Sequence, residues 1–427
     1  MQGMVVVDGA GNGKDASTNN PTTTRPPPKL LRPLLLVAVL ATAFLAAVVL
    51  LLGAGAGAGM TSPALPNLDA LRRPAACARN EDKEASSASG LRRWTRAPAS
   101  AWHNMSDEEL LWAASWRPSV RRYPYRRVPK VAFMFLTRGP LPLAPLWEGF
   151  FAGAGSRDHF SVYVHATPGY RPNFPPTSVF YRRQVPSQVT RWGDPSMCDA
   201  ERRLLANALL EPGNERFVLL SETCVPLFAF PVAYTYLTRS RHSFVGAFDD
   251  PGPHGRGRYR PALAPEVRRS QWRKGAQWFE LDRALAVDVV ADARYYPKFR
   301  EHCRPPCYVD EHYLPTVLSV EAPDRIANRS VTWVDWSRGG AHPATFGAAD
   351  VDEAFLKRLT SSAAADGEQR SGKERPCTYN GQPAEVCYLF ARKFAPSALE
   401  PLLKLAPKML GYGGGSTRNN SAAKRIG

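Results

Sequence analysis

Apolar runs of strand length alternate with amphipathic helical segments between residues 130 and 291. The runs that predict strands are 130–137, 160–165, 179–185, 217–221, 243–248 and 277–281. The segments that predict helices are 144–152, 199–210, 232–238 and 282–291. Strands that alternate with helices are typical of an α/β fold, so we expect a mostly parallel mixed sheet flanked by helices.

Several polar side chains come directly after the expected strands. Thr137, His165 and Ser221 end three of them, and Asp249 and Asp250 follow a fourth. Ligands of such sheets usually bind outside the carboxyl ends of the strands. We therefore expect these residues at the ligand-binding edge of the sheet.

The N-terminal part contains an apolar run of 19 residues, 34–52, that only Thr42 interrupts. As a helix it would span about 28 Å, close to the hydrocarbon thickness of a bilayer. A cleaved signal peptide is the alternative, but the run is longer than a usual signal and begins after 33 residues. We interpret it as a membrane anchor. Basic residues precede it and no charge follows before Asp69, which predicts a type II topology.

The anchor divides the chain into five parts. These are a cytosolic tail (1–33), a transmembrane signal-anchor helix (34–52), a lumenal stem (53–129), a globular domain (130–410) and a flexible C-terminal tail (411–427). The stem is rich in Pro, Ala, Ser and Arg. We expect one short helix in it, opened by a capping box of Ser106 and Glu109.

A lumenal location agrees with the sequons and the cysteines. Glycosylation sequons at Asn104, Asn328 and Asn419 all follow the anchor. All seven cysteines follow it too, in a compartment where disulfides form. Because seven is odd, at least one cysteine stays free or pairs between chains, and Cys77 in the stem is our candidate.

Cys303 and Cys307 allow two interpretations. Together with His302 and His312 they could bind zinc. We favour a disulfide, because the lumen is oxidising and no second cysteine pair has zinc-site spacing.

The net charge of +17 suggests anionic partners. A lumenal protein does not meet nucleic acid, so nucleotide-sugar diphosphates, acidic glycans and lipid headgroups are better candidates. We interpret much of the surplus charge as solvated surface. The hydrophobic content of 44% is enough for a sizeable core.

Asp310, Glu311 and His312 stand at the start of an apolar segment with helical spacing. The segment predicts a helix with Asp310 as N-cap and Glu311 in the first turn. Glu311 could face a ligand and accept a proton, or it could only complement the helix dipole. These residues alone leave both interpretations open.

Asp249 and Asp250 precede Pro251 and Gly252. Aspartate clusters hold divalent cations in many sugar-nucleotide enzymes, but adjacent Asp residues on an extended backbone point to opposite sides, so we favour a turn. The sequence has no P-loop motif and no Gly-x-Ser-x-Gly elbow, which argues against P-loop phosphoryl transfer and α/β-hydrolase chemistry.

Aromatic residues alternate with cations in segment 271–280, which includes Trp278. Aromatic faces stack on sugar rings and cations bind anionic groups, so the segment could line an acceptor site. A strand with one buried aromatic face and a basic edge is equally consistent with it. Segment 331–336, with Trp333, leaves the same choice between a sugar platform and core.

Seven motifs follow one another in a family-specific order. They are KVAFMFLT at 130–137, LLSETCVPL at 219–227, FDDPG at 248–252, QWFEL at 277–281, DEHYLPT at 310–316, WVDWSRGGAHP at 333–343 and LFARKF at 389–394. In this order the chain resembles the plant branch of the core-2/I-branching β-1,6-N-acetylglucosaminyltransferase family, glycosyltransferase family 14, which includes the brittle-culm-type proteins. The resemblance covers about residues 128–410.

This resemblance implies a GT-A-like nucleotide-sugar glycosyltransferase fold in a Golgi membrane protein with a lumenal catalytic domain. It implies a UDP-sugar donor such as UDP-N-acetylglucosamine, a glycan or glycoprotein acceptor, and inverting transfer without an essential metal or other cofactor. Glu311 matches the catalytic base of the family. Arg375 and Lys393 match the cations that neutralise the departing diphosphate, and Trp333 matches an acceptor-stacking tryptophan.

The chain departs from characterised animal members at three positions. His165 and Thr223 lie in segments where those members carry Asp residues, and Asp335 replaces an aromatic residue of the acceptor region. We expect Thr137 and His165 at the donor site, and Asp335 and Trp278 at the acceptor site. Cell-wall polysaccharides and the glycans of secreted glycoproteins are the candidate acceptors.

Two other functions stay open on the sequence. A lumenal glycan-binding or scaffold protein could keep the fold without catalysis, because two Asp positions have changed. A hydrolase could use Asp249 and Glu311 as paired carboxylates, provided that they lie a defined distance apart.

Overall fold

The structure is a computed structural model that describes Thr95, Tyr123 and residues 97–118, 127–340, 342–361 and 377–413. The predicted cytosolic tail and anchor lie outside these residues, together with Cys77, Arg375 and Asn419. In the part of the chain that is described, no helix combines the length and the apolar character needed to cross a bilayer.

Four strands form the central sheet in the order β2-β1-β3-β5. They are β1 (Lys130–Leu136), β2 (Phe160–His165), β3 (Asn214–Ser221) and β5 (Glu280–Asp282). β1 pairs in parallel with both β2 and β3, whereas β5 is antiparallel to β3. The predicted mostly parallel mixed sheet is therefore confirmed.

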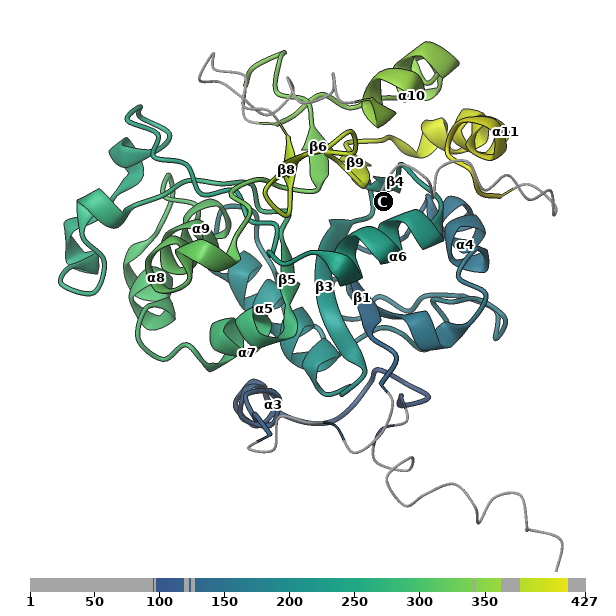
Figure 1. Cartoon of the computed structure of the whole chain (residues 1–427). Helices are drawn as coiled ribbons and strands as arrows, with labels where there is room; N and C mark the ends of the chain where they lie inside the picture. Colours follow the sequence, from purple (N-terminus) through teal and green to yellow (C-terminus); the bar gives the residue numbers. More distant parts are fainter. Residues whose placement is uncertain are drawn as a thin grey trace, which may run out of the picture. The chain divides into compact units, whose positions relative to one another are not determined.

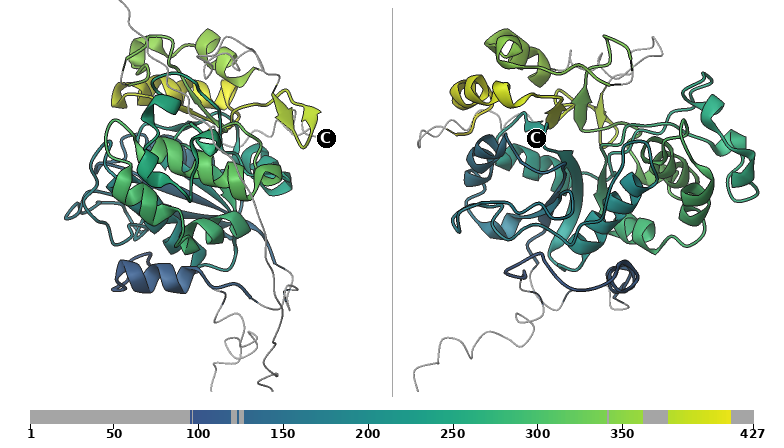
Figure 2. Two further views of the ribbon diagram at one scale, coloured as in Figure 1. Left: turned by 90° about the vertical axis from the view of Figure 1, so that its left-hand side faces the viewer. Right: turned by 180° about the vertical axis from the view of Figure 1, so that it is seen from behind.

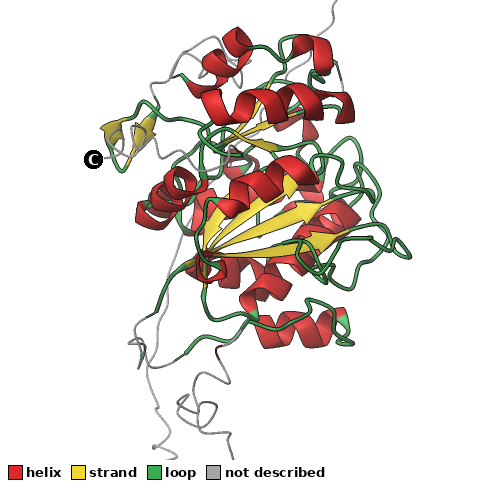
Figure 3. Ribbon diagram, turned by 90° about the vertical axis from the view of Figure 1, so that its right-hand side faces the viewer, coloured by secondary structure: helices red, strands yellow, loops and turns green. Residues whose placement is uncertain are grey.

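Helices cover both faces of this sheet (Figure 3). Along β1, Phe133 and Phe135 pack into one hydrophobic cluster, and Ala132 and Met134 pack into another. Successive side chains of a strand point to opposite faces, so a strand between two helical layers needs apolar residues at every position. This requirement explains the unbroken apolar run of β1.

The two clusters draw on different helices. The first contains side chains from α4 (Ala144–Ala152), α6 (Phe230–Arg239), α10 (Glu353–Thr360) and α11 (Leu399–Met409). The second contains side chains from α3 (Asp107–Ala114), α5 (Ser196–Leu209), α7 (Arg283–Ala291), α8 (Tyr296–His302) and α9 (Val309–Glu321). Part of the predicted stem thus packs on the globular domain through α3.

A second sheet of three short strands has the order β4-β9-β6. Its members are β4 (Val225–Pro226), β6 (Thr332–Val334) and β9 (Phe390–Arg392), and a separate hairpin joins β7 (Thr378–Tyr379) to β8 (Gln382–Pro383). Figures 1 and 2 show this sheet close to α10 and α11. Because β4 begins four residues after β3 ends, the second sheet lies at the carboxyl end of β3.

Strong local signals placed several elements correctly. The predicted helix at 144–152 and strand at 160–165 have the predicted bounds, and α5 begins three residues before its predicted start. Ser106 and Glu109 form the expected capping box of α3. Asp282 caps α7 by accepting a hydrogen bond from the Leu285 N–H at 2.9 Å.

Two predicted strands, 179–185 and 243–248, are wrong. The first makes one isolated bridge, between Gln184 and Val164, while its apolar side chains are buried in the core. The second makes single bridges to three different segments, at Ile326, Glu280 and Lys274. In both cases apolar residues are buried without one neighbouring strand along which a ladder could continue.

Disulfides join Cys303 to Cys307 and Cys377 to Cys387. The first bond confirms the favoured interpretation over zinc, because both thiolates are consumed. Cys198 and Cys224 are free and buried among the described residues.

The structure includes two of the three sequons. Asn104 is exposed at the surface. Asn328 is half-buried, and its side-chain carbonyl accepts a hydrogen bond from the Ala247 N–H at 2.7 Å. The Ser330 hydroxyl of the same sequon is buried and donates to the Trp278 carbonyl at 2.8 Å.

Candidate active site

Helix α9 presents Glu311 in its first turn. The residue before the helix is Tyr308, which has a left-handed conformation with φ of 52°, and no side chain caps the helix there. The predicted N-cap role of Asp310 is therefore wrong: Asp310 is the second residue of the helix.

Two cations contact the Glu311 carboxylate. Arg258, from the short helix η3 (Arg256–Arg258), donates from Nη1 to Oε2 at 2.6 Å, and the Lys274 Nζ lies 3.4 Å from the same oxygen. The Glu311 side chain keeps 26% of its surface exposed. It is thus accessible to a ligand while it is held between two positive charges.

The position of Lys274 depends on a close backbone approach. The Gly275 N–H donates to the Glu311 carbonyl at 2.9 Å. A Cβ at Gly275 would lie 2.0 Å from the Gly246 carbonyl oxygen and 2.8 Å from Cγ of Pro315. Only glycine fits between these groups, so Gly275 brings Lys274 next to Glu311.

Opposing effects act on the pKa of Glu311. Burial alone would raise it, but Lys274 and Arg258 together lower it below its usual value. The carboxylate is therefore ionised at neutral pH, as a general base must be before it accepts a proton.

The pKa of the neighbouring carboxyl group, that of Asp310, is shifted in the opposite direction. Burial, reinforced by the charge of Glu311, raises the pKa of Asp310 to about 7. Its Oδ1 is buried and has no hydrogen-bond partner among the described residues. Glu201 of α5 also lies near Asp310, and burial followed by the charge of Asp310 raises its pKa. Of these three carboxyl groups, Glu311 is the one whose pKa is lowered.

His312 is packed inside the domain. Its Nδ1 lies 2.8 Å from the Arg273 carbonyl, and its ring stacks on Trp272 with centroids 4.5 Å apart. Burial lowers the pKa of His312 to about 4. The ring is therefore neutral and anchors α9 to the segment that carries Lys274.

Lys393 directly follows β9 (Phe390–Arg392). Burial and the nearby charges of Arg392 and Arg138 lower its pKa, while Glu222 acts in the opposite direction. Arg138 follows β1 and Glu222 follows β3, so both lie at the carboxyl edge of the sheet. Positively charged side chains thus lie at the edge of the sheet where the fold predicts a ligand.

Thr137 and His165, the other predicted donor residues, are enclosed. Thr137 donates through its hydroxyl to the Gly139 carbonyl at 3.1 Å. His165 is 1% exposed, and its Nε2 lies 3.3 Å from the Gln188 N–H and 3.2 Å from Nη1 of Arg203. Burial and the Arg203 charge lower the pKa of His165 to about 3. These contacts connect β2 to α5, and donor binding by His165 stays a prediction.

The predicted acceptor residues are largely buried. Trp278 is 6% exposed and stacks against the Arg392 guanidinium, 3.9 Å from the ring centroid. Trp333 is 8% exposed and packs against Phe346. Asp335 accepts a hydrogen bond from the Ser337 N–H at 2.8 Å. The burial of the two tryptophans agrees with the interpretation that they belong to the core. Their acceptor roles stay predictions.

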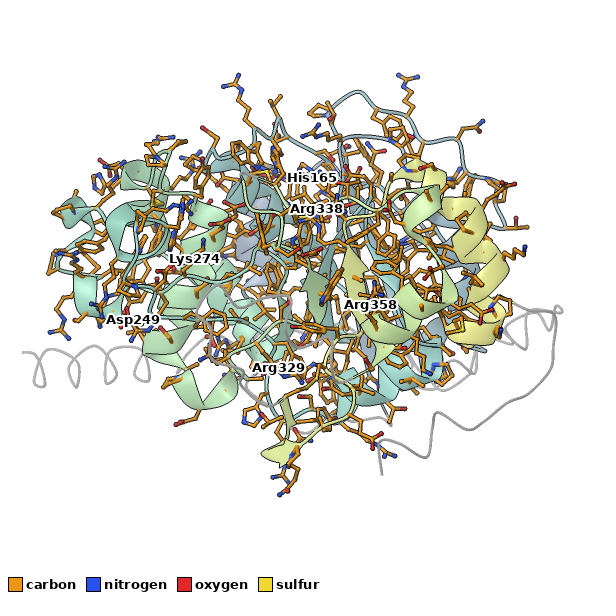
Figure 4. All side chains as sticks on the ribbon, turned by 90° about the horizontal axis from the view of Figure 1, so that it is seen from above. His165, Asp249, Lys274, Arg329, Arg338 and Arg358 are labelled. Carbon is orange, nitrogen blue, oxygen red and sulfur yellow. A yellow bond between two sulfur atoms is a disulfide. The ribbon has the colours of Figure 1, made fainter. Side chains whose placement is uncertain are left out.

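Asp249 and Asp250 form the turn that we favoured. Asp249 makes a bidentate ion pair with Arg256, at 2.7 and 2.6 Å, and Asp250 accepts from the Gly252 N–H at 2.7 Å. Figure 4 shows Asp249 and Lys274 on the same half of the molecule, away from Arg358 of α10. Within the described ranges, no cluster of three or more His, Cys, Asp or Glu side chains could hold a metal ion.

Sequence reasoning missed Arg258 and Arg138. Arg258, in the short helix η3, is 53 positions from Glu311, and no periodicity connects the two residues. Lys274 belongs to the basic aromatic segment, but its partner was not predictable.

Comparisons with known proteins identify the family of the chain. The family model of the Core-2/I-Branching enzymes matches residues 131–360, more than half of the chain, including Glu311, Arg258 and Lys274. Glycosyltransferase BC10 of Oryza sativa subsp. japonica is 38% identical over 322 residues, which cover 67% of this chain and 79% of that protein. The chain therefore belongs to the Core-2/I-Branching enzyme family and is a glycosyltransferase of that family.

Proposed function

We propose that the protein is a type II Golgi membrane glycosyltransferase with a GT-A-like fold that transfers N-acetylglucosamine from UDP-N-acetylglucosamine to a glycan acceptor. The transfer is an inverting displacement that needs no metal, and Glu311 is the base. The observation that carries the proposal is the partly exposed, ionised Glu311 carboxylate, whose Oε2 contacts both Arg258 and Lys274.

The contacts of Glu311 support a division of work between its oxygens. Both cations contact Oε2, so we assign Oε1 to the acceptor hydroxyl. Oε1 accepts the hydroxyl proton while the hydroxyl oxygen attacks the anomeric carbon from the side opposite to UDP. The new glycosidic bond forms as the bond from the anomeric carbon to the UDP oxygen breaks, and the anomeric configuration inverts.

The leaving diphosphate needs compensation for its growing negative charge. Lys393 and Arg138 supply cations at the carboxyl edge of the sheet, and Arg375, outside the described residues, is assigned to the same task through the family resemblance. We propose that the transfer needs no metal because these positively charged side chains can take the place of a metal ion. Residues 34–52 are the proposed membrane anchor.

Thermal stabilisation of the protein by a panel of sugar nucleotides, each with and without EDTA, tests the proposal. We expect UDP-N-acetylglucosamine to raise the melting temperature equally in both conditions. A shift abolished by EDTA would contradict metal independence, and a shift with a different UDP-sugar alone would correct the donor. If no nucleotide binds, the alternative of a non-catalytic glycan-binding protein replaces the proposal.

A further inference from the structure

Three aromatic rings from distant parts of the chain meet near the start of α9. The Trp192 ring lies 5.2 Å from the Tyr308 ring and 5.3 Å from the His342 ring, measured between centroids. Trp192 is 55% exposed, whereas Trp147, Trp272, Trp278 and Trp333 are buried. We call the three rings the aromatic platform.

The platform is connected to the proposed base. The Arg258 guanidinium lies 4.6 Å from the centroid of the Tyr308 ring, and the same group is bonded to Glu311. A ligand on the platform would therefore lie one side chain away from the carboxylate that accepts the proton.

Close packing holds the platform in place. Gly193 has φ of 75°, and a Cβ there would lie 2.9 Å from Cε1 of Tyr308. The disulfide between Cys303 and Cys307 closes the loop immediately before Tyr308. The backbone next to Trp192 is thus packed closely against the Tyr308 ring.

Exposed aromatic rings on a rigid support are suited to carbohydrate. A β-linked pyranose with equatorial substituents presents a flat face of axial C–H groups, which stacks on an aromatic face. The faces of the Trp192 and Tyr308 rings carry no charge, so the contact that they offer is to the C–H face of a sugar ring, which a neutral pyranose presents. Trp333, the tryptophan expected to stack on the acceptor, is 8% exposed and belongs to a hydrophobic cluster, whereas Trp192 is 55% exposed.

We propose that Trp192, Tyr308 and His342 form an acceptor subsite that binds a neutral β-linked pyranose next to the sugar whose hydroxyl Glu311 deprotonates. This inference rests on the proposed function, because it assigns the acceptor side of the same site. It makes the acceptor an oligosaccharide rather than a monosaccharide.

Binding of three neutral tetrasaccharides to the full-length protein tests the subsite. Saturation-transfer NMR would be recorded with cellotetraose, xylotetraose and β-1,3-galactotetraose for the unaltered chain and for the Trp192→Ala, Trp192→Phe and Trp112→Ala variants. Trp112, 64% exposed on α3, is the matched control. We expect at least one tetrasaccharide to bind about tenfold more weakly to Trp192→Ala, with binding largely kept by Trp192→Phe and unchanged in Trp112→Ala.

Two results would overturn the subsite: no tetrasaccharide binds the unaltered chain, or Trp192→Ala binds as well as the unaltered chain does. Hydrolysis of UDP-N-acetylglucosamine, measured separately, tests the proposed function. Binding that depends on Trp192 without donor hydrolysis would support the aromatic platform as a glycan site and overturn the transferase proposal. Donor hydrolysis without tetrasaccharide binding would support the transferase proposal and overturn the subsite.

Discussion

Glu311 combines two properties that a general base needs, partial exposure to solvent and ionisation. Burial raises the pKa of a carboxyl group, and in this site the neighbouring cations reverse that effect for Glu311 but not for Asp310. The pKa values of two adjacent carboxyl groups are therefore shifted in opposite directions. Their separate roles follow from position alone, since one side chain meets Arg258 and Lys274 and the other faces the interior.

Replacing Glu311 by Gln should lower turnover by a factor on the order of 10² or more, because the amide cannot accept the acceptor proton. Donor binding and the melting temperature should remain close to those of the unaltered chain, since the shape is kept. Steady-state transfer rates measure the first effect, and UDP titration measures the second. Near-normal turnover would remove Glu311 from the mechanism.

Replacing Arg258 by Gln should move the acidic limb of the pH profile of kcat/KM to higher pH. The cation favours the charged form of Glu311, so its removal raises the pKa of the base, and activity is then lost earlier as the pH falls. Arg256→Gln is the control, because Arg256 pairs with Asp249 instead. Coincident acidic limbs in Arg258→Gln and the unaltered chain would show that Arg258 does not tune the base.

Replacing Lys393 by Ala should weaken UDP binding about tenfold or more, because a charge-assisted contact to the diphosphate is lost. Isothermal titration with UDP measures the change. The exposed Lys408, which pairs with Glu353, provides the control variant Lys408→Ala. Equal UDP affinities in both variants would count against the assigned role.

At the scale of elements, the site depends on how the segment that carries Lys274, the helix η3 and the start of α9 pack against one another. The segment that carries Lys274 lies against α9 through the Gly275 N–H and through His312, while the helix η3 brings Arg258. None of these contacts lies within one helix or strand. The surroundings of Glu311 at the start of α9 therefore depend on packing between elements. A change in that packing should alter the contacts of the Glu311 carboxylate.

The substitution Gly275→Ala should destabilise the protein by about 1–3 kcal/mol, because a Cβ would overlap the Gly246 carbonyl and Pro315. It should also reduce transfer activity, since Lys274 would move away from Glu311. Urea unfolding measures the first effect. Gly149→Ala on α4 is the control, because its nearest neighbour would lie at an ordinary 3.4 Å. If both variants unfold at the same urea concentration, the close approach is not required.

At the scale of the whole molecule, a buried ion pair joins two neighbouring strands of the central sheet. Arg216 of β3 makes bidentate contacts of 2.6 and 2.7 Å with Glu280 of β5, and it also donates to the His242 carbonyl at 2.8 Å. Both side chains are almost completely buried. This pair fixes the antiparallel edge strand that precedes α7.

Glu280→Gln should cost about 3–5 kcal/mol of unfolding free energy, because it leaves the Arg216 charge buried without compensation. The double variant Arg216→Met with Glu280→Gln should recover part of this loss, since the uncompensated charge is removed. Chemical unfolding of the three chains measures the difference. A double variant less stable than Glu280→Gln would show that the buried charge is not the cause.

Much of the fold was predictable from local pattern. The strands β1 and β2 and the helix α4 are dense apolar segments with clear ends, and their bounds followed from burial and turn residues. Segments 179–185 and 243–248 have equally apolar sequences, but a strand also needs a neighbour with free hydrogen-bonding groups. Whether such a neighbour exists is a property of the folded chain.

The sequence by itself determined the α/β class, the family and the first-turn position of Glu311, because these depend on residue order over short distances. Only the tertiary structure decided that Arg258 and Lys274 contact Glu311, that Trp333 is core, and that Trp192 joins Tyr308 and His342. Charge compensation and ring stacking act across a few ångströms of space, and the residues that they join are separated by 37 to 150 positions of chain.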